Sequence, residues 1–249
     1  AVISQIADDF PADMLFKKRS RRRDIIKKFT LINGLQTITD TIASDKNIEI
    51  VKGTEVLSLD YNNGLFNIGT ENTIYTSQML AIATNTAESS KLLQRSFPEI
   101  AKLIGGIEVK RINTVAVAIK AEKTSLPPSA GIIPVNDAFF SIVTRDTVKD
   151  PNYRGFVFHF KPDSLGKSER MDRIVKVLGI TSSDIIQVVE KENLVPSLRL
   201  GHESLVHSID NLISGRPLFL TGNYFDGLAI EDCVSRSYKE FLRLKKFLK

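Results

Sequence analysis

The sequence predicts an α/β fold with a second domain built on an antiparallel sheet. The first sign is a series of short strands before residue 84, ending in a near-continuous apolar run at 79–84. Such a run is typical of a strand buried on both faces. The second sign is a group of three longer, alternating strands within residues 114–160. The third is an apolar strand, a glycine turn and a helical pattern that occupy residues 216–249.

The composition is that of an ordinary globular protein, because 42% of the 249 residues are hydrophobic and 25% are charged. The longest apolar runs span only a few residues, so no transmembrane helix is expected. The first ten residues already contain two aspartates, which does not fit a secretory signal. The single cysteine, Cys233, excludes an intrachain disulfide and a cysteine zinc cluster. It suits a reducing compartment, so a cytoplasmic location is expected.

The net charge of +5 arises from one segment, because residues 17–28 hold eight basic residues and one acid. Met14–Lys28 is predicted to form a basic helix or a helix and loop. Three roles remain open for this segment: a solvated helix face, attraction of an anionic substrate or membrane surface, or nucleic-acid binding. Phe16 and Phe29 only flank the run, and no aromatic residue interleaves with its arginines. We therefore expect no nucleic-acid partner, while peripheral membrane contact stays open.

The first third of the chain is predicted from apolar spacing and turn residues. Leu35, Ile38 and Ile42 lie three and four residues apart and predict one short helix. Asn62-Asn63-Gly64 is a strong hairpin signal. The surrounding segments predict short strands at residues 48–53, 54–61, 65–69, 72–76 and 79–84.

The middle of the chain predicts helices and a separate antiparallel sheet over residues 107–200. One helix is expected at residues 86–105 and another at 163–178, capped by Asp163 or Ser164. Strands are expected at residues 114–121, 139–145, 155–160 and 184–190. The final helix should carry an apolar face opposite its arginines and lysines. That face is formed by Val234, Tyr238, Phe241, Leu242 and Leu248.

The stretch LFLTGNYFDGLAIEDCV, residues 218–234, places a turn between the last strand and the last helix. A helix N-terminus exposes unpaired N–H groups and the positive end of the helix dipole, so it suits an anion or an electron-rich carbonyl. Gly222 permits a tight turn after the strand, and Gly227 permits close approach to the backbone. The local pattern alone fits an ordinary strand–turn–helix packing unit equally well.

The same stretch resembles the C-terminal flavin segment of the protoporphyrinogen oxidase and amine oxidase superfamily. That segment runs from an apolar strand through glycine and a polar residue to a second glycine and a helix. The version with asparagine after the first glycine, and Asp-Cys in the helix, is most like protoporphyrinogen oxidases. The matching residues here are Gly222, Asn223, Gly227, Asp232 and Cys233.

Further segments are similar to the same superfamily. NGLQTITDTIA, residues 33–43, resembles its Gly-Gly-Leu helix, with Asn33 in place of the first glycine. VPSLRLGHESLVHSID, residues 195–210, resembles its Pro-x-Tyr-x-x-Gly-His segment, with Leu198 in place of the tyrosine. GTEVLSL with the following meander and AIATNT is similar to the superfamily's adenine-side strand and the loop that returns to the flavin domain. The resemblance therefore covers most of the chain.

The resemblance implies that the cofactor is FAD. Backbone amides near Leu228, Ile230 and Asp232 would stabilise negative charge at the pyrimidine edge of the flavin ring as it is reduced. The physical reason is that fixed dipoles are most effective where charge develops.

The resemblance also implies cofactor contacts nearer the adenine. Val56 would offer its backbone N–H and C=O groups to the adenine, and Ala83 and Thr84 would line the nearby cofactor wall. The superfamily's Gly-x-Gly-x-x-Gly unit, which cradles the pyrophosphate, has no match in residues 1–249. We therefore expect the chain to be the C-terminal part of a longer flavoenzyme, with the missing N-terminal part as its partner. By itself it is expected to be inactive.

This interpretation assigns the chain to two domains. Residues 31–86 and 206–249 would belong to a partial FAD-binding domain of the two-dinucleotide-binding-domain type. Residues 1–30 and 87–205 would form the substrate-binding domain.

The expected function is that of a FAD-dependent oxidoreductase that removes hydride from its substrate, most like a protoporphyrinogen oxidase. A phytoene-desaturase-like enzyme or an amine oxidase is the alternative within the class. A cofactor-free binding module derived from the same fold is the alternative from another class.

No residue is assigned a catalytic role, because hydride transfer to a flavin needs no protein nucleophile. His202 and His207 have no cysteine or paired carboxylate at metal-ligand spacing, so no metal site is expected and His202 is expected to be structural. Cys233 is expected to be a packing residue rather than a nucleophile.

Overall fold

The computed structural model describes residues 31, 33–146 and 150–248. The predicted basic helix at Met14–Lys28 lies outside the described residues. The chain divides into two compact units. Unit 1 comprises residues Ala1–Glu49 and Arg111–Val195, and unit 2 comprises Ile50–Lys110 and Pro196–Lys249. Both are mixtures of helices and sheets, as the sequence predicts.

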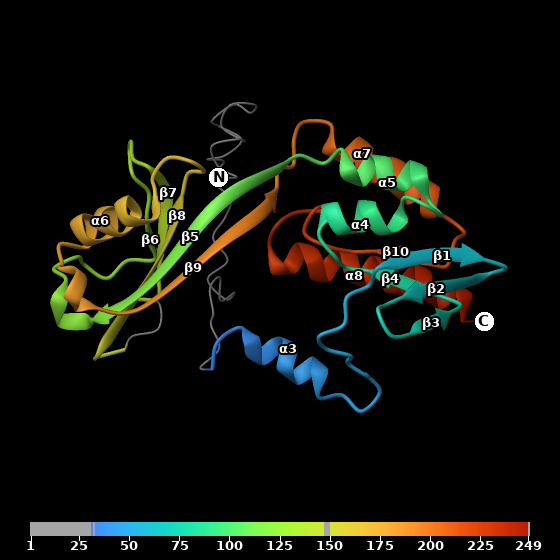
Figure 1. The fold of residues 1–249 in the computed structure, drawn as a ribbon, viewed down its shortest axis with the longest axis horizontal. Coiled ribbons are helices and arrows are strands. Elements are labelled where there is room, and N and C mark those ends of the chain that lie inside the picture. Colours follow the sequence, from blue (N-terminus) through green and yellow to red (C-terminus); the bar gives the residue numbers. More distant parts are fainter. Residues whose placement is uncertain (1–30, 32, 147–149, 249) are drawn as a thin grey trace, which may run out of the picture. The chain divides into compact units, whose positions relative to one another are not determined.

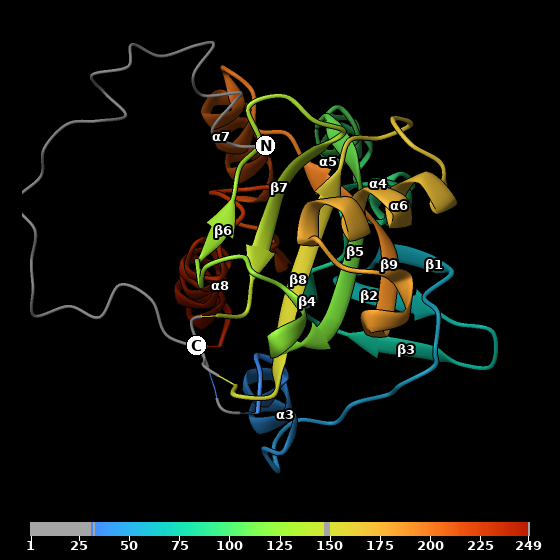
Figure 2. The ribbon, with the colours of Figure 1, turned by 90° about the vertical axis from the view of Figure 1, so that its left-hand side faces the viewer.

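Unit 1 is built on a five-stranded sheet with the order β6-β7-β8-β5-β9 (Figure 2). The neighbours β6–β7, β7–β8 and β5–β8 pair antiparallel. The strands are β5 (Val109–Lys120), β6 (Gly131–Ile132), β7 (Phe139–Thr144), β8 (Tyr153–Phe160) and β9 (Ile185–Pro196). The helices are α3 (Gln36–Ala43), α6 (Lys167–Leu178), η1 (Ala121–Lys123) and η2 (Ser182–Asp184).

The core of unit 1 follows from strand alternation. Every second residue of β8 from Phe156 to Phe160 is fully buried, and these rings pack with the alternating residues Val115, Val117 and Ile119 of β5. Helix α6 covers this face through two buried residues of its apolar side, Ile174 and Leu178. The predicted strands are therefore confirmed, and most are longer than the patterns indicated.

One expectation for the helices of unit 1 needs correction. Helix α6 begins after Gly166, because the Glu169 carboxylate accepts a hydrogen bond from the Gly166 N–H at 2.7 Å, so neither Asp163 nor Ser164 is its cap. The short helix predicted from Leu35, Ile38 and Ile42 is confirmed as α3, and all three side chains are exposed.

Unit 2 combines an antiparallel meander with a small parallel sheet (Figure 1). The first two strands of the meander are joined by the hairpin turn at Asn63-Gly64, where both residues have positive φ as a type I′ turn requires. Its strands are β1 (Ser58–Asn62), β2 (Leu65–Gly69) and β3 (Ile74–Ser77). The parallel pair is β4 (Leu80–Ile82) and β10 (Leu218–Leu220). The helices are α4 (Thr86–Leu93), α5 (Pro98–Gly105), α7 (His202–Ile213), α8 (Ile230–Leu244) and η3 (Lys245–Phe247).

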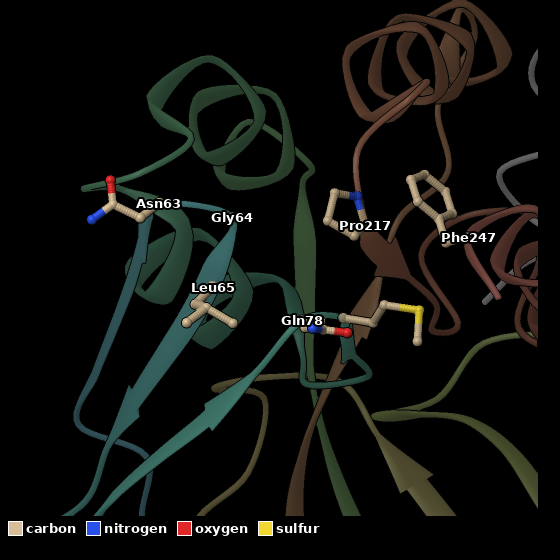
Figure 3. Close-up of a pocket in the computed structure, with 7 residues that line it drawn as sticks. Asn63, Gly64, Leu65, Gln78, Pro217 and Phe247 are labelled. Carbon is tan, nitrogen blue, oxygen red and sulfur yellow. The ribbon is translucent and has the colours of Figure 1, made fainter. Parts of the chain in front are cut away.

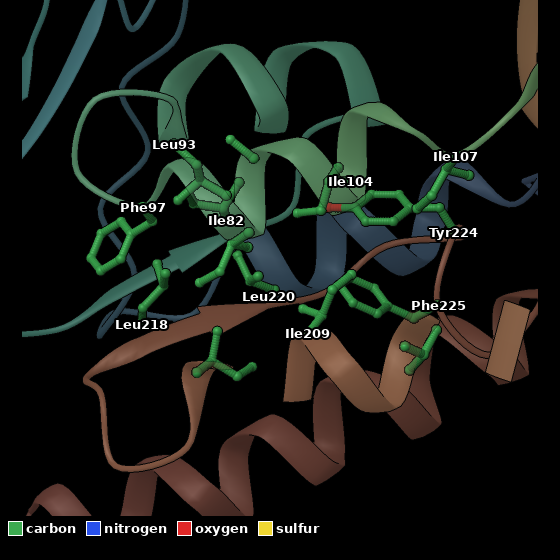
Figure 4. Close-up of a cluster of buried hydrophobic side chains, with 14 of the residues drawn as sticks. Ile82, Leu93, Phe97, Ile104, Ile107, Ile209, Leu218, Leu220, Tyr224 and Phe225 are labelled. Atoms are coloured by element: carbon green, nitrogen blue, oxygen red, sulfur yellow. The ribbon is translucent and has the colours of Figure 1, made fainter. Parts of the chain in front are cut away.

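The core of unit 2 lies between the parallel pair and helices α4, α5 and α7 (Figure 4). Ile82, Leu218 and Leu220 contribute from the strands. The helices contribute Leu93, Phe97, Ile100, Ala101, Ile104, Val206, Ile209 and Ile213. Because α4, α5 and the start of α7 share this core, residues 87–110 and 196–205 belong to unit 2. The observed division therefore differs from the boundaries expected at residues 87 and 205, and it also places residues before 50 in unit 1 instead of with residues 50–86.

Three local predictions in unit 2 are wrong. The helix expected at residues 86–105 is two helices, because Pro98 lacks an N–H and starts α5 as a new helix. Residues 48–53 form no strand, and Ile50 and Val51 are exposed. Strand β4 is not buried on both faces, because Ala81 is exposed. A strand needs a partner for its backbone groups, and among the described residues no strand pairs with residues 48–53.

The apolar face predicted for the last helix is present on α8, but the polar side of the helix faces inward. Arg236 is only 2% exposed and Glu240 is buried, whereas Val234, Tyr238, Phe241, Leu242 and Leu248 are 45–62% exposed. The reason is that Glu240 and Arg236 hydrogen-bond the backbone of Leu220 in β10. Among the described residues, no helix is both long and apolar enough to cross a lipid bilayer.

Candidate functional site

The two parallel strands of unit 2 bring two predicted cofactor segments together. Strands β4 and β10 run in register from Leu80↔Leu218 to Ile82↔Leu220, and the Thr221 N–H extends the ladder to Ile82 O at 3.0 Å. Ala83 and Thr84 therefore leave the sheet beside Gly222 and Asn223. The carboxyl ends of parallel strands are where open α/β sheets bind ligands.

The turn after β10 is anchored by its two aromatic residues, which point into the core (Figure 4). Tyr224 is fully buried, and its hydroxyl lies 3.1 Å from Ser89 Oγ. Ser89 Oγ in turn lies 2.8 Å from Thr84 Oγ1. Burial raises the pKa of Tyr224, so the phenol stays protonated. These contacts connect the turn after β10 to the turn after β4.

Phe225 is held from two sides. The Arg236 guanidinium of α8 lies 4.1 Å from the centre of the Phe225 ring. The Phe225 carbonyl can only accept, and His202 Nε2 lies 3.0 Å away, so Nε2 carries the proton and donates it. The Gly-His pair at residues 201–202 thus has a structural role at this turn, in line with the prediction for His202.

Both glycines of the turn are needed for its backbone. Gly222 has φ 149° and Gly227 has φ 148°, backbone angles that residues other than glycine rarely adopt. A Cβ on Gly222 would lie 2.7 Å from Cε1 of Tyr224. A Cβ on Gly227 would collide with the Asp232 carboxylate. The two positions therefore fix where the chain enters α8.

The N-terminus of α8 lacks a capping side chain on its first-turn amides. Its N-cap residue is Ala229, which has no acceptor, and the first intrahelical bond is from Cys233 N–H to Ala229 O at 3.2 Å. The amides of Ile230 and Glu231 therefore have no helical carbonyl to bind. Asp232 is already engaged, because its carboxylate accepts from the Ala229 N–H at 2.9 Å.

This N-terminus is accessible. Ala229 and Ile230 are exposed and Leu228 is half-buried, while the bulky Tyr224 and Phe225 point away into the core. No described side chain caps the first turn, so a flat polar group can approach the free amides. The residues present therefore fit the pyrimidine edge of a flavin ring.

The remaining predicted residues are placed as follows. Asn223 is exposed at the start of the turn, and Ala83 and Thr84 are exposed after β4. Val56 is exposed in the extended residues before β1, outside the group of contacts that anchors the turn. Burial and the neighbouring Asp232 raise the pKa of the Cys233 thiol, which disfavours a thiolate nucleophile.

The sequence interpretation missed one polar cluster, which lies in unit 1. Thr114 Oγ1 is 3.2 Å from His159 Nδ1 and accepts from Asn193 Nδ2 at 2.8 Å. The three side chains come from β5, β8 and β9, on the face opposite the buried phenylalanines. Burial lowers the pKa of His159. Strand alternation alone could have placed Thr114 and His159 on this face. Among the described residues, no group of side chains has the make-up of a metal site.

A cavity of about 450 Å³ lies at the other end of the parallel strands (Figure 3). It is lined by Asn63, Gly64, Leu65, Gln78, Met79, Pro217 and Phe247. Met79 and Pro217 precede β4 and β10, so the cavity is at the amino ends of the strands. It is separate from the turn at the carboxyl ends.

Comparison with known proteins supports the resemblance on which the site was first predicted. The chain is 38% identical over 74 residues to the protoporphyrinogen oxidase of Dictyostelium discoideum, a match that spans 28% of this chain and 14% of that protein. No protein-family model matches the chain.

Solved structures share the fold. A candidate protoporphyrinogen oxidase from Exiguobacterium sp. 255-15 matches with a TM-score of 0.70 and 16% identity, over 87% of this chain and 52% of that chain. Cyclohexylamine oxidase from Brevibacterium oxydans IH-35A matches with a TM-score of 0.63 and 11% identity, over 87% of this chain and 53% of that one. The chain is thus similar to protoporphyrinogen and amine oxidases, and it spans about half the length of these structures.

Proposed function

We propose that this chain forms the flavin-facing part of a FAD-dependent oxidoreductase of the protoporphyrinogen oxidase and amine oxidase type. The observation that carries the proposal is the accessible, uncapped N-terminus of α8, entered through Gly227. It lies in the segment that resembles the flavin segment of that superfamily. The shared fold with the Exiguobacterium and Brevibacterium proteins supports it.

The chain's own residues would hold and polarise the cofactor. The amides of Ile230 and Glu231 would face the flavin carbonyl edge, where a fixed dipole stabilises negative charge without reorganisation. Arg236 stacks on the Phe225 ring and His202 hydrogen-bonds the Phe225 carbonyl, so Phe225 would keep that helix end in place. When bound, FAD would accept a hydride from the substrate, and the protein would supply binding, orientation and electrostatics.

We favour a porphyrinogen as the substrate. The Asn223 and Asp232-Cys233 version of the segment is most like protoporphyrinogen oxidases, and the curated relative carries that name. Amine oxidation or a phytoene-desaturase-like reaction is the alternative, since the fold is shared with a cyclohexylamine oxidase. Unit 1 would serve as the substrate-binding domain, with Thr114, His159 and Asn193 on its polar sheet face.

We further propose that the pyrophosphate of FAD is bound by a segment beyond this chain. No Gly-x-Gly-x-x-Gly pattern occurs in residues 1–249, and the chain spans only about half of the matched structures. The isolated chain is then inactive, and its natural partner is the remainder of the same protein.

The test is an absorption spectrum of the longer polypeptide, followed by anaerobic titration with protoporphyrinogen and, separately, with cyclohexylamine. Bound flavin that protoporphyrinogen bleaches supports the proposal. Bleaching by the amine alone would move the substrate to the amine class. A purified polypeptide without flavin absorption would contradict the proposal and favour a cofactor-free binding module.

Gly227→Leu provides the matched variant, because its side chain would collide with Asp232 and strain the entry to α8. We expect it to lose its flavin. Gly215→Leu is the control, because Gly215 also has positive φ but no atom lies within 4 Å of an added Cβ. Normal flavin content in Gly227→Leu would contradict the assignment of this turn.

A further inference from the structure

The sheet of unit 1 has a second face, opposite the one that buries its phenylalanines. Across the neighbouring strands β7, β8 and β5 (Figure 2), residues that lie opposite one another in the register form three rows on this face. We call them the polar row (Ser141, His159, Thr114), the apolar row (Val143, Val157, Ala116) and the small row (Arg145, Gly155, Ala118). None of these residues is buried. The face therefore changes from polar to apolar along the strands, and a ligand can reach it.

The apolar and small rows are low compared with the other side of the same sheet. On β8, Val157 and Gly155 alternate with the phenylalanines of the core face. A Cβ on Gly155 would lie 2.9 Å from Cγ of Arg145, so the aliphatic part of the Arg145 side chain lies on this face. Arg145 is exposed, and among the described residues no carboxylate forms an ion pair with it. The two rows thus form a flat apolar floor with a positive charge at its end.

The polar row contains a directed chain of hydrogen bonds. Asn193 of β9 donates from Nδ2 to Thr114 Oγ1 at 2.8 Å. The hydroxyl proton of Thr114 then has His159 Nδ1, 3.2 Å away, as its acceptor. Burial lowers the pKa of His159, so its ring is neutral at pH 7 and carries one proton. Because Nδ1 accepts, that proton lies on Nε2.

The Nε2–H group of His159 is the donor that this chain of hydrogen bonds leaves over. No hydrogen bond joins it to a residue that the structure describes. The two nitrogens of an imidazole ring point in nearly opposite directions, so Nε2–H points away from Thr114. A partly buried donor loses free energy unless an acceptor reaches it. The polar row therefore presents a single, oriented donor beside the apolar floor.

We propose that this face of unit 1 binds a flat apolar carboxylate, and that His159 is the residue that selects it. One carboxylate oxygen accepts from Nε2–H, and the apolar body of the ligand lies over the apolar row. Arg145 attracts the negative charge of the ligand, and hydrogen bonds to a carboxylate are stronger than those to a neutral acceptor. Thr114 and Asn193 are positioning residues, because they fix which nitrogen of His159 carries the proton.

The same geometry disfavours an amine as the ligand. A protonated amine can only donate hydrogen bonds, and His159 offers it only a donor. Arg145 would also repel it, because both groups are positively charged. The proposal rests on the proposed function only where it identifies this ligand as the substrate, and there it favours a carboxylate-bearing substrate over a simple amine.

The tautomer of His159 can be measured without any ligand. The chain has three histidines, so the ring nitrogens of His159 are assigned by comparing ¹⁵N NMR spectra of the chain and of His159→Gln. We expect the Nε2–H form at pH 7.5. Thr114→Val removes the hydroxyl proton and should raise the population of the Nδ1–H form. A predominant Nδ1–H form in the original chain would overturn the proposal.

Binding is tested on the full chain with two probes that share one ring system, 2-naphthoate and 2-naphthylmethylamine, by titration calorimetry. We expect 2-naphthoate to bind at least about tenfold more tightly than the amine. His159→Leu should weaken 2-naphthoate binding by about tenfold or more, because a hydrogen bond to a charged group is lost. Equal affinities for the two probes, or no detectable binding of 2-naphthoate, would overturn the proposal.

Two further variants distinguish recognition from a loss of structure. His159→Gln keeps an N–H donor near the position of Nε2, so it should weaken 2-naphthoate binding by less than about threefold. His207→Gln, at an exposed position of α7, is the control and should leave the affinity unchanged. An affinity in His159→Leu equal to that of the original chain would overturn the role of His159.

The outcomes separate this inference from the proposed function. Binding of 2-naphthoate that depends on His159, together with a longer polypeptide that holds no flavin, would keep the carboxylate site and refute the flavoenzyme. Bound flavin that protoporphyrinogen bleaches equally fast in the original protein and in His159→Leu would keep the enzyme and refute the site.

Discussion

Units 1 and 2 bury their sheets in different ways. In unit 1 an antiparallel sheet packs one face under α6, with Phe156, Phe158 and Phe160 fully buried. In unit 2 a parallel pair is buried on one face, and the other is half covered, with Ala81 exposed. Antiparallel sheets commonly leave one face to water, whereas parallel sheets are mostly covered on both faces. Both units have a buried core, and the comparison shows that only the parallel pair of unit 2 departs from the usual covering of its sheet type, at Ala81.

The helices of the two units show the same contrast. Helix α6 buries apolar Ile174 and Leu178 against its sheet. Helix α8 instead buries Arg236 and Glu240 and exposes its apolar side. An amphipathic helix normally turns its apolar side to the core. The orientation of α8 is explained by the backbone groups of β10 that its polar side binds.

The largest effect should come from truncating a core ring in unit 1. Phe158→Ala removes a fully buried side chain that packs 5.5 Å from Phe139 and 5.9 Å from Phe160, ring centre to ring centre. We expect a loss of about 3–5 kcal/mol in unfolding free energy. Tyr238→Ala on α8 should change it by less than about 0.5 kcal/mol, because the ring is exposed. Urea denaturation measures both, and a similar loss in both variants would break the contrast between the units.

A second effect concerns the two arginines of α8 that donate hydrogen bonds to the backbone of β10. Arg236→Met removes a bond to Leu220 O and the contact with the Phe225 ring, so we expect a loss of about 2–3 kcal/mol. Arg243→Met is the matched variant, because it also binds β10 and an aromatic ring but does not touch the turn. The backbone amides of residues 222–227 should exchange their hydrogens faster in Arg236→Met and not in Arg243→Met. Equal exchange in both variants would refute a specific role of Arg236 at the turn.

A third effect compares two glycines with positive φ. Gly227→Ala should cost about 2 kcal/mol, because it combines an unfavourable φ with a collision against Asp232. Gly179→Ala at the end of α6 should cost about 1 kcal/mol, since φ is 66° but the space around it is free. Thermal unfolding of both variants checks the order. A larger loss for Gly179→Ala would contradict the packing described at Gly227.

The smallest effect is a pH dependence in unit 1. Burial lowers the pKa of His159 from its usual 6.5 in the folded state, so the unfolded chain binds the proton more tightly. The unfolding free energy should therefore fall as the pH drops below about 6.5, by at most about 1.4 kcal/mol per pH unit. In His159→Gln the unfolding free energy should change less with pH, which urea denaturation at pH 7.5 and at pH 5.5 measures. His207→Gln, at an exposed position of α7, serves as the control, and an unchanged slope in His159→Gln would refute the assignment.

The accuracy of the sequence predictions depends on how local each signal is. The hairpin at Asn63-Gly64 and the strands of unit 1 were predicted correctly, because turn chemistry and alternation are local signals. The missing strand at residues 48–53, the exposed Ala81 and the orientation of α8 were not predicted. Each depends on which distant backbone groups are available for pairing, and apolar spacing does not carry that information.

For the candidate site, the glycine turn could be predicted from sequence and its anchors could not. Gly222 and Gly227 were found because a turn and a close approach require glycine. The contacts of Phe225 with Arg236 and His202, and of Tyr224 with Ser89, join residues far apart in the chain. The absence of a capping side chain at Ala229 was visible in the sequence, and only the structure identified it as the N-cap.

The central claim is that the first-turn amides of α8 are left uncapped for the flavin, and Ala229→Ser tests it most directly. A serine N-cap would accept from these amides and should stabilise the protein by about 1 kcal/mol. In the longer polypeptide, we expect Ala229→Ser to raise the melting temperature of the apoprotein and to weaken FAD binding several-fold in a fluorescence titration. A variant that is more stable and binds FAD as tightly as the original would contradict the claim.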